Sequence, residues 1–431
     1  MDYGEALAWL HNRINLETIR LPGRVRPPSL DRMHELMKLM AEPQKQYPVI
    51  HLTGTNGKTS TARIVTRILQ AAGIDVGTFT SPHLERINER IARNDEPIPD
   101  DDLAEVLTAI SHLEPLMTEA PSFFDVITSA AFRWFADVAV HAAVVEVGML
   151  GTWDTTNVVD GSVAVITNIG ADHLDFAPTL EAIAREKAGI VKEGSTLVLG
   201  ETDPAYASIF DATPAAQVWR RDEDFACVRN DLAHGGRVLS IRTPAAQYDD
   251  LFLSLHGAFQ GENAAMAVAA VEAFLGQPIE TAIVEEALAT ATSPGRLEVM
   301  GRSPLVVVDG AHNQPGAEAL AATLVEEFGD AEEWTVVVGL LTPHDPADLL
   351  GALDPIRIKT VIATEPSFAP RAVSADVVAA AADDAGYDVA VAPTVASAVR
   401  EARDVAGEQG RVLVTGSLYV VGDARAVLGD R

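Results

Sequence analysis

Residues 49–65 read Val49-Ile50-His51-Leu52-Thr53-Gly54-Thr55-Asn56-Gly57-Lys58-Thr59-Ser60-Thr61-Ala62-Arg63-Ile64-Val65. This is an apolar run, then a turn with two glycines, then the start of a helical pattern. Backbone N–H groups at a helix N-terminus point at an anion, Gly54 and Gly57 allow close approach, and Lys58 adds positive charge. The stretch therefore predicts a strand, a phosphate-binding loop and a helix. An ordinary strand-to-helix turn is the alternative, because Leu52 replaces the first glycine of the general P-loop pattern.

Lysine is rare in this chain, so its positions are informative. Lys and Arg together number 32, and only six of them are Lys. Arginine does not replace lysine where a compact ammonium or a nucleophilic amine is needed. Lys58 and Lys187 are therefore candidate catalytic residues. Lys187 falls on the apolar side of a predicted short helix, where burial would lower its pKa and the neutral amine could take up CO2 as a carbamate.

Helical and strand patterns alternate along the first two thirds of the chain. Such alternation predicts parallel strands joined by crossover helices. Residues 220–255 instead predict antiparallel strands at the edge of the sheet, followed by a helix from Gly261 to about Leu275. The predicted parallel strands are Val49–Leu52, Ala142–Val147, Val163–Thr167 and Leu197–Leu199, with helices such as Thr59–Ala72 and Leu103–Leu113 between them.

A second series of strands and helices follows the break at 291–295, which we interpret as a hinge. Its predicted strands are Leu305–Val308, Thr335–Val338, Thr360–Ala363, Val389–Ala392 and Val412–Val414. We therefore expect two α/β domains. Residues 1–293 would form a P-loop-type domain with a mostly parallel sheet and an N-terminal helix and basic loop. Residues 294–431 would form a smaller Rossmann-like domain.

Composition excludes several classes of partner. The net charge of −30 disfavours nucleic acid or an anionic membrane. The single cysteine, Cys227, excludes an intramolecular disulfide and fits a reducing compartment. No apolar run reaches the ~18 residues of a membrane span, and the first residues are acidic where a signal peptide would be basic. We expect a cytoplasmic monomer that acts on small molecules, with neither nucleic acid nor membrane as a partner.

Three polar residues lie at or just after the ends of predicted strands, at positions that suit a metal ion. They are Glu146, His173 and Ser81. Ligands of open α/β sheets bind at the carboxyl ends of the strands, and Mg²⁺ prefers carboxylate and hydroxyl oxygens together with phosphates. Each residue has a structural alternative. Glu146 could cap a helix, His173 could be a hydrogen-bonded loop residue, and Ser81 could belong to a proline turn.

Together these motifs resemble the folylpolyglutamate synthase/dihydrofolate synthase family of the Mur ligase superfamily. The resemblance extends from about Leu7 to Tyr419. Besides the phosphate-binding loop, its specific pieces are Thr80-Ser81-Pro82-His83-Leu84, Arg86-Ile87-Asn88-Glu89-Arg90-Ile91, Val145-Glu146-Val147-Gly148, Asp172-His173, Glu186-Lys187-Ala188-Gly189-Ile190, Pro294-Gly295-Arg296-Leu297-Glu298, Asp309-Gly310-Ala311-His312-Asn313 and Thr415-Gly416-Ser417-Leu418-Tyr419.

The resemblance implies an ADP-forming ligase. ATP would phosphorylate the carboxylate of a folate or dihydropteroate, and the amine of L-glutamate would displace the phosphate. The implied catalytic residues are Lys58, Lys187, His173 and Arg296. The implied nucleotide contacts are Gly54, Asn56, Gly57, Lys58, Thr59, Ser60, Asn263, Arg296 and Asp309. Ser81 and Glu146 would bind one Mg²⁺, and His173 with carbamylated Lys187 would bind a second. The pterin substrate would lie near Ser122, Phe123, Phe124, Asp125, Trp153, Asp154 and Thr155, and glutamate near His312 and Ser417.

Three stretches depart from the family pattern. Thr59 stands where most folate ligases have glycine, Leu150-Gly151-Thr152 replaces Gly-Gly-Arg, and Pro343-His344-Asp345 replaces Asp-Lys-Asp. Two alternative functions are a cell-wall ligase that extends a UDP-linked peptide and a non-catalytic nucleotide switch. The Ser81-Pro82-His83 loop argues against the first, and Lys187 with the second-domain residues argues against the second.

Overall fold

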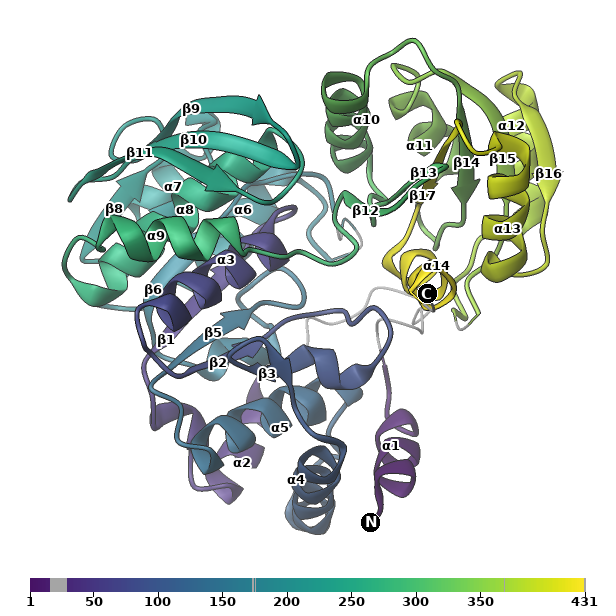
Figure 1. Cartoon of the computed structure of the whole chain (residues 1–431). Helices are drawn as coiled ribbons and strands as arrows, with labels where there is room; N and C mark the ends of the chain where they lie inside the picture. The colour runs from purple at the N-terminus through teal and green to yellow at the C-terminus, as the bar shows by residue number, and fades with distance from the viewer. Residues whose placement is uncertain (16–28, 173, 175, 368, 430–431) are drawn as a thin grey trace.

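The computed structural model describes residues 1–15, 29–172, 174, 176–367 and 369–429, which form two α/β units (Figure 1). The predicted basic loop around Arg20, Arg24 and Arg26 lies outside the described residues. The first unit contains an eight-stranded and a three-stranded sheet, and the second contains a six-stranded sheet. The α/β fold class is confirmed. None of the helices in the described part of the chain has both the length and the apolar character needed to cross a bilayer.

The large sheet has the strand order β4-β3-β2-β5-β1-β6-β7-β8 and is parallel from β2 to β8. The strands β3 and β4 are antiparallel additions at one edge. All four predicted parallel strands are confirmed as β1, β5, β6 and β7. The bounds are β1 Val49–Thr53, β2 Val76–Phe79, β3 Ile91–Arg93, β4 Glu96–Pro97, β5 Ala142–Glu146, β6 Gly161–Ile166, β7 Thr196–Leu199 and β8 Gln217–Arg220.

Alternating side chains of β1 pack on opposite faces of this sheet. Ile50 and Leu52 join the core formed with α3 (Lys58–Ala71), α8 (Phe259–Leu275) and α9 (Thr281–Ala289). Val49 joins the core on the other face, formed with the remaining helices of this half of the sheet. These are α1 Tyr3–His11, α2 Asp31–Leu39, α4 Asp100–Leu113 and α5 Phe123–Asp137; α6 Leu180–Ala188 and α7 Ala207–Asp211 cover β6 and β7.

The antiparallel strands predicted within residues 220–255 exist, but their predicted place at the edge of the large sheet is wrong. They form a separate sheet of β9 (Ala226–Ala233), β10 (Gly236–Arg242) and β11 (Gln247–Leu253), whereas β8 occupies the edge. Figure 1 shows this sheet lying over α8 and α9. Its alternating apolar residues, including Leu239 and Leu251, are buried against α8 in the same core as β1. One apolar face therefore favours packing on a helix rather than pairing with β8.

The second unit has the strand order β12-β13-β17-β14-β15-β16, in which only β12 is antiparallel. All five predicted strands are confirmed, but β12 was not predicted because its residues are only half-buried and form no apolar run. The bounds are β12 Glu298–Arg302, β13 Leu305–Val308, β14 Trp334–Val338, β15 Ile358–Ala363, β16 Asp388–Val391 and β17 Arg411–Thr415; α10 Gln314–Phe328, α11 Pro346–Ala352 and α12 Ala375–Asp384 cover one face, and α13 Val395–Ala406 and α14 Leu418–Leu428 the other.

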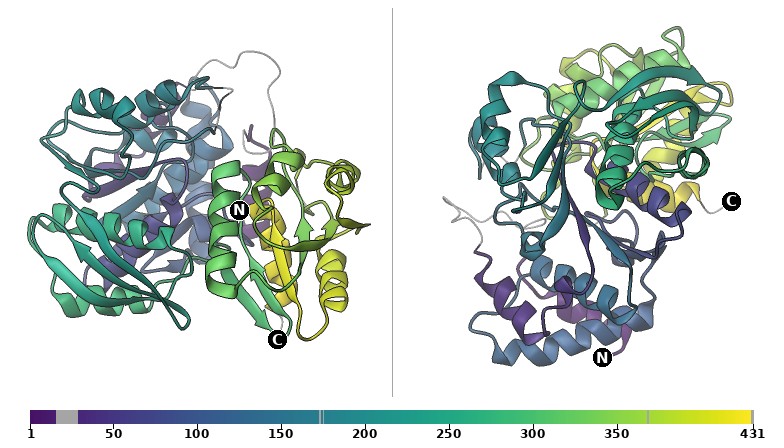
Figure 2. Two further views of the ribbon diagram at one scale, coloured as in Figure 1. Left: turned by 90° about the horizontal axis from the view of Figure 1, so that it is seen from above. Right: turned by 90° about the vertical axis from the view of Figure 1, so that its left-hand side faces the viewer.

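Ion pairs connect the two units at two separate places. Arg237 of β10 contacts α10 through Glu326, at 2.9 Å, and Glu327, at 3.3 Å. The proximity of the three-stranded sheet to the second unit is visible in Figure 2. At the second place, Arg425 of α14 contacts Glu85 of the first unit at 2.9 Å. The first pair is buried, since the side chains of Arg237 and Glu327 are 2% and 3% exposed.

Replacing Arg237 with methionine is expected to lower the free energy of unfolding by about 3 kcal/mol, because the buried Glu327 then keeps only His256 Nδ1, at 2.6 Å, and the N–H of Gly257, at 2.7 Å, as partners among the described residues. Chemical denaturation measures this loss. Glu326 is 42% exposed, so Glu326→Gln is the matched control, with an expected loss below about 1 kcal/mol. An equally small loss in the Arg237 variant would show that this buried pair does not stabilise the protein.

Candidate active site

The loop between β1 and α3 is shaped by contacts that only glycine permits. A Cβ atom on Gly54 would lie 1.7 Å from Thr167 Oγ1, and one on Gly57 would lie 2.6 Å from Asn263 Oδ1. Gly57 has a φ of 83° and is the N-cap of α3, so the first N–H groups of that helix face the loop. The predicted strand, loop and helix are thus confirmed. Gly54, Gly57 and Asn263 are brought together as expected.

Lys58 folds back over this loop. Its Nζ donates hydrogen bonds to the carbonyl oxygens of Gly54, at 2.8 Å, and Thr55, at 3.1 Å. Burial lowers the pKa of Lys58, and the carboxylates of Glu146 and Asp172 oppose this effect. A compact cation is therefore held at the mouth of the phosphate-binding loop.

Glu146 lies at the C-terminal end of β5, beside the same loop. Its carboxylate is buried and accepts hydrogen bonds from Thr59 Oγ1, at 2.9 and 3.0 Å, and from the backbone N–H of Ser81, at 3.3 Å. Burial raises the pKa of Glu146, and the ammonium of Lys58 opposes that rise. The structure thus brings Glu146, Ser81 and Thr59 together. The helix-capping alternative gains no support, because the bond from α3 comes from the Thr59 hydroxyl rather than from backbone N–H groups.

Lys187 is 3% exposed near the end of α6. Among the described residues, no hydrogen bond or ion pair of its ammonium is found. Burial, followed by repulsion from Lys58, lowers the pKa of Lys187 well below its ordinary value. The predicted burial of this lysine is therefore observed. His173, its predicted partner, lies outside the described residues.

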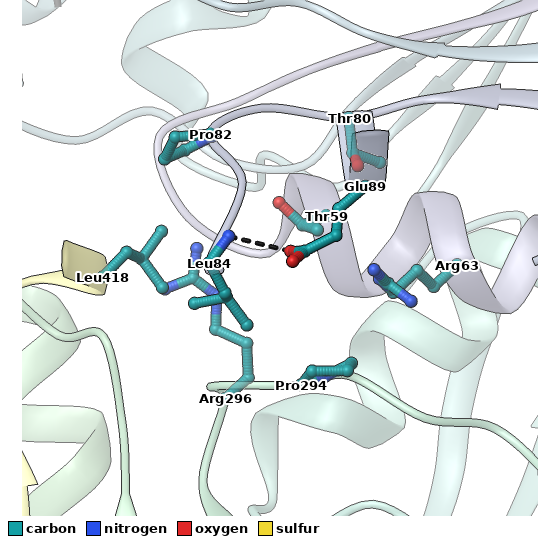
Figure 3. A pocket seen from close by; sticks show the side chains of 9 residues that line it. All are labelled: Thr59, Arg63, Thr80, Pro82, Leu84, Glu89, Pro294, Arg296 and Leu418. Atoms are coloured by element: carbon teal, nitrogen blue, oxygen red, sulfur yellow. Dashed lines mark hydrogen bonds between the residues drawn. The ribbon is translucent and has the colours of Figure 1, made fainter. Parts of the chain in front are cut away.

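The second unit brings three polar residues to the loop. Asn313 Nδ2 donates to Asn56 Oδ1 at 3.3 Å. Asp309 accepts the backbone N–H groups of Leu297 and Ala311, each at 2.7 Å, which fixes the turn that carries Arg296. Burial raises the pKa of Asp309, and the nearby charge of Arg296 opposes it. The Arg296 side chain extends into a pocket together with Thr59 of the loop helix (Figure 3).

His312 has a defined orientation near the same loop. Its Nδ1 lies 2.9 Å from the carbonyl oxygen of Gly310, which places the proton on Nδ1 and leaves Nε2 as an acceptor. Burial lowers the pKa of His312, which favours the neutral ring. Its centroid lies 5.0 Å from that of His344. Ser417, by contrast, is the buried N-cap of α14, and its hydroxyl accepts the N–H of Val420.

The side chains of two further predicted contact residues, Ser60 and Phe123, point away from the sites at which they were predicted to bind. Ser60 is buried and its hydroxyl lies 2.9 Å from Ser293 Oγ at the hinge, so only its backbone N–H is available to the loop. Phe123 is 2% exposed, stacks on His11 and lies under Arg90. It belongs to the core, whereas the half-buried Phe124 lies against Gly148 at the end of β5.

The rest of the predicted pterin region is a network of local hydrogen bonds. Ser122 and Asp125 cap the start of α5 reciprocally. Asp154 accepts the N–H of Met149 at 2.8 Å and so shapes the loop after β5. Thr155 Oγ1 lies 2.9 Å from Thr128 Oγ1 of α5. These two segments are therefore adjacent, with the half-buried Trp153 in the same loop.

Comparison with known proteins identifies this arrangement. The Mur ligase middle domain matches residues 52–271, and the glutamate ligase domain of Mur ligases matches residues 295–418. The dihydrofolate synthase/folylpolyglutamate synthase of Mycobacterium tuberculosis is 38% identical over 445 residues, which cover 93% of this chain and 90% of that protein. The chain belongs to the Mur ligase family. Its relatives are ligases that form C–N bonds.

Solved structures of similar proteins support the same family for this ligase. The folylpolyglutamate synthase of Mycobacterium tuberculosis, complexed with ADP and AMPPCP, matches with a TM-score of 0.91 and 36% identity over 100% of both chains. An Escherichia coli enzyme, FolC, in complex with DHPP and ADP matches with a TM-score of 0.87 and 28% identity over 100% of this chain and 98% of that one. The family resemblance inferred from the motifs is confirmed.

Two of the departures from the family pattern can now be placed in this ligase. Thr152 donates its backbone N–H and its hydroxyl to the carbonyl oxygen of Glu186, at 3.0 and 3.1 Å. It therefore holds the end of α6, one residue before Lys187. His344 lies beside His312, and burial lowers the pKa of His344 to about 4.

Several residues of the site were not predicted. Thr167 donates its hydroxyl to the carbonyl oxygen of Asn56 at 2.6 Å, and Asn168 accepts the N–H of Asn56 at 2.9 Å. Asn313 reaches Asn56 from the other unit. Thr167 and Asn168 follow β6 directly, so their position at a strand end was the available signal.

Proposed function

We propose that this protein ligates L-glutamate to the carboxylate of a folate or a dihydropteroate and releases ADP and phosphate. The observation that carries the proposal is the convergence of a glycine loop with Lys58 from one unit and Arg296, Asn313 and His312 from the other. Relatives across the whole chain are named dihydrofolate synthase/folylpolyglutamate synthase. We also propose a domain boundary at 293/294 and a cytoplasmic monomer.

The reaction has two steps. An oxygen of the pterin carboxylate bonds to the γ-phosphorus of ATP, and ADP leaves, which yields an acyl phosphate. The neutral amine of L-glutamate then attacks the carbonyl carbon, phosphate leaves, and the amine loses a proton. Backbone N–H groups at the start of α3, Lys58 and Arg296 stabilise the negative charge that moves between phosphate oxygens. Since Nε2 of His312 is an acceptor, it is placed to receive a hydrogen bond from the glutamate ammonium.

The residues around Glu146 fit a Mg²⁺ ion bound with ATP. Glu146 is buried with no cation within ion-pair distance among the described residues, and its neighbours Thr59 and Ser81 carry hydroxyl groups. Hydroxyl and carboxylate oxygens together with phosphates are the ligands that Mg²⁺ prefers. When bound, the ion neutralises phosphate charge. Ser81, Glu146 and Thr59 would hold it.

A second Mg²⁺ would need His173 and a modified Lys187. In the described part of the chain, no three His, Cys, Asp or Glu side chains gather as a metal site. A carbamate on Lys187 would add two oxygens to a region where the carboxylates of Asp172 and Asp154 already act on this lysine. The lowered pKa of this buried amine favours its neutral, reactive form.

The two alternative functions receive less support. A cell-wall ligase would share the loop and Lys187, but the relatives named above are folate enzymes over at least 93% of the chain. A non-catalytic switch would not need Arg296 and His312 beside the phosphate loop. The ligase reaction accounts for residues of both units.

The proposal is tested by ADP release. We expect release only when ATP, Mg²⁺, L-glutamate and a pterin substrate are present together, with dihydropteroate and tetrahydrofolate assayed separately. A UDP-muramoyl peptide serves as the competing acceptor. Turnover with that peptide and none with either pterin would overturn the proposal in favour of the cell-wall alternative.

A further inference from the structure

One cation that faces the interface between the units has no role in the reaction as described above. Arg63 lies on α3, one turn after Thr59, and lines two adjoining pockets. The larger has a volume of about 290 Å³ and reaches Asp95 and Arg425. Figure 3 shows the guanidinium groups of Arg63 and Arg296 on opposite sides of the smaller pocket, which also contains Thr59.

The acidic groups of these pockets already have partners. Glu89 accepts the backbone N–H groups of Leu84, at 2.9 Å, and Arg86, at 2.7 Å. Glu85 pairs with Arg425 at 2.9 Å. Asp95 pairs at 3.3 Å with Arg67, and the nearby charges of Arg63 and Arg67 oppose the rise that burial causes in the pKa of Asp95.

Arg63 differs from Arg425, which pairs with Glu85. Within the described parts of the chain, no hydrogen bond or ion pair involves the guanidinium of Arg63 or that of Arg296, and Arg296 already has a role in the reaction. In a chain with a net charge of −30, an arginine that lines a pocket and makes no ion pair suits an anionic ligand. A guanidinium binds a carboxylate with two parallel hydrogen bonds, so this is the anion it fits best.

We propose that Arg63 binds the α-carboxylate of the glutamyl residue whose γ-carboxylate is phosphorylated. This inference rests on the proposed function and defines the substrate class of the site. Thr59 and Arg63 are four residues apart on α3, a rise of about 6 Å along the helix. Four C–C bonds of about 1.5 Å separate the two carboxyl carbons of glutamate, so they span roughly 5 Å when extended. A γ-carboxylate beside Thr59 thus places the α-carboxylate beside Arg63.

The subsite distinguishes the two pterin substrates. A folate carries a glutamyl α-carboxylate, whereas dihydropteroate ends in an aromatic carboxylate and has none. Arg63 therefore acts as a specificity-determining residue for glutamylated substrates. Arg63 contributes to the binding of the pterin substrate, whereas Lys58 and Arg296 stabilise the charge of the transferred phosphate.

The test uses tetrahydrofolate and the analogue in which a carboxamide replaces the α-carboxylate. We expect wild-type kcat/KM to be about ten- to hundredfold lower for the amide, as for the loss of one charge-assisted hydrogen-bonded pair. In Arg63→Met the kcat/KM values of the two compounds should agree within about threefold. This is the result of a double-mutant cycle in which the protein group and the substrate group interact only with each other. Arg67→Met is the matched control, since Arg67 is on the same helix but binds Asp95 and Thr290 instead. This control should keep the wild-type discrimination.

Each other outcome is decisive. Equal discrimination by wild type and Arg63→Met, or no discrimination by wild type, overturns the subsite. So does turnover of dihydropteroate without turnover of tetrahydrofolate, although the ligase function then stands. If neither dihydropteroate nor tetrahydrofolate supports ADP release, both proposals are overturned. Circular dichroism and denaturation of both variants confirm that they are folded.

Discussion

Lys58→Ala is expected to lower kcat/KM for ADP release by at least about a thousandfold, the upper range for the loss of one group that stabilises transition-state charge. The ammonium is held 2.8 Å from the carbonyl oxygen of Gly54 and 3.1 Å from that of Thr55. It therefore needs little reorganisation to meet a phosphate oxygen. Fold stability should change little, because burial already disfavours this charge in the free protein.

Lys58→Arg is expected to lower kcat/KM for ADP release nearly as much as Lys58→Ala. The two carbonyl oxygens converge on a single nitrogen, and a planar guanidinium has a wider, forked set of donors. Lys45→Ala is the control, because Lys45 is a surface lysine with a 52% exposed side chain paired with Glu42. Steady-state ADP release and denaturation curves are measured for all three variants. Wild-type-like turnover in Lys58→Arg would show that a point charge is not required in this loop.

The phosphate loop could be predicted because its constraints are local. Gly54 and Gly57 are required by close approaches to Thr167 and Asn263, and a glycine between an apolar strand and a helix reveals such positions. The parallel strands were predictable for the same reason, since buried strands are continuous apolar runs. Burial of Lys187 followed from its position on the apolar side of α6.

Features that depend on distant contacts could not be predicted. The hydroxyl of Ser60 points to Ser293 rather than to the loop, and nothing in its neighbours in sequence indicates this. Phe123 and Phe124 are adjacent, yet only Phe123 enters the core, because the direction of α5 decides which ring faces inward. Arg63 was not a candidate because its lack of a partner is visible only when every nearby carboxylate is placed.

Lys187→Ala should lose activity as severely as Lys58→Ala, because we propose that Lys187 carries a carbamate. The neutral amine adds CO2 to form an N–CO2⁻ group and releases one proton. An unmodified ammonium in this position would be a buried cation close to Lys58, which already repels it. A carbamate reverses the sign of the charge and is attracted by Lys58 instead. The structure of α6 suits the modification, because Thr152 fixes the carbonyl oxygen of Glu186 next to it.

Three measurements test the carbamate. High formate or acetate should restore part of the activity of Lys187→Ala, and Lys187→Glu should recover less than its charge suggests, because its shorter arm misplaces the oxygens. Lys192→Ala is the control, since burial also lowers the pKa of Lys192, but its amine donates a hydrogen bond to the carbonyl oxygen of Asn157 at 3.0 Å. Wild-type protein equilibrated with ¹³CO2 should show one carbamate carbon signal that is absent from Lys187→Ala and present in Lys192→Ala. An active wild-type enzyme without that signal would refute the modification, and the second metal site would then need another ligand.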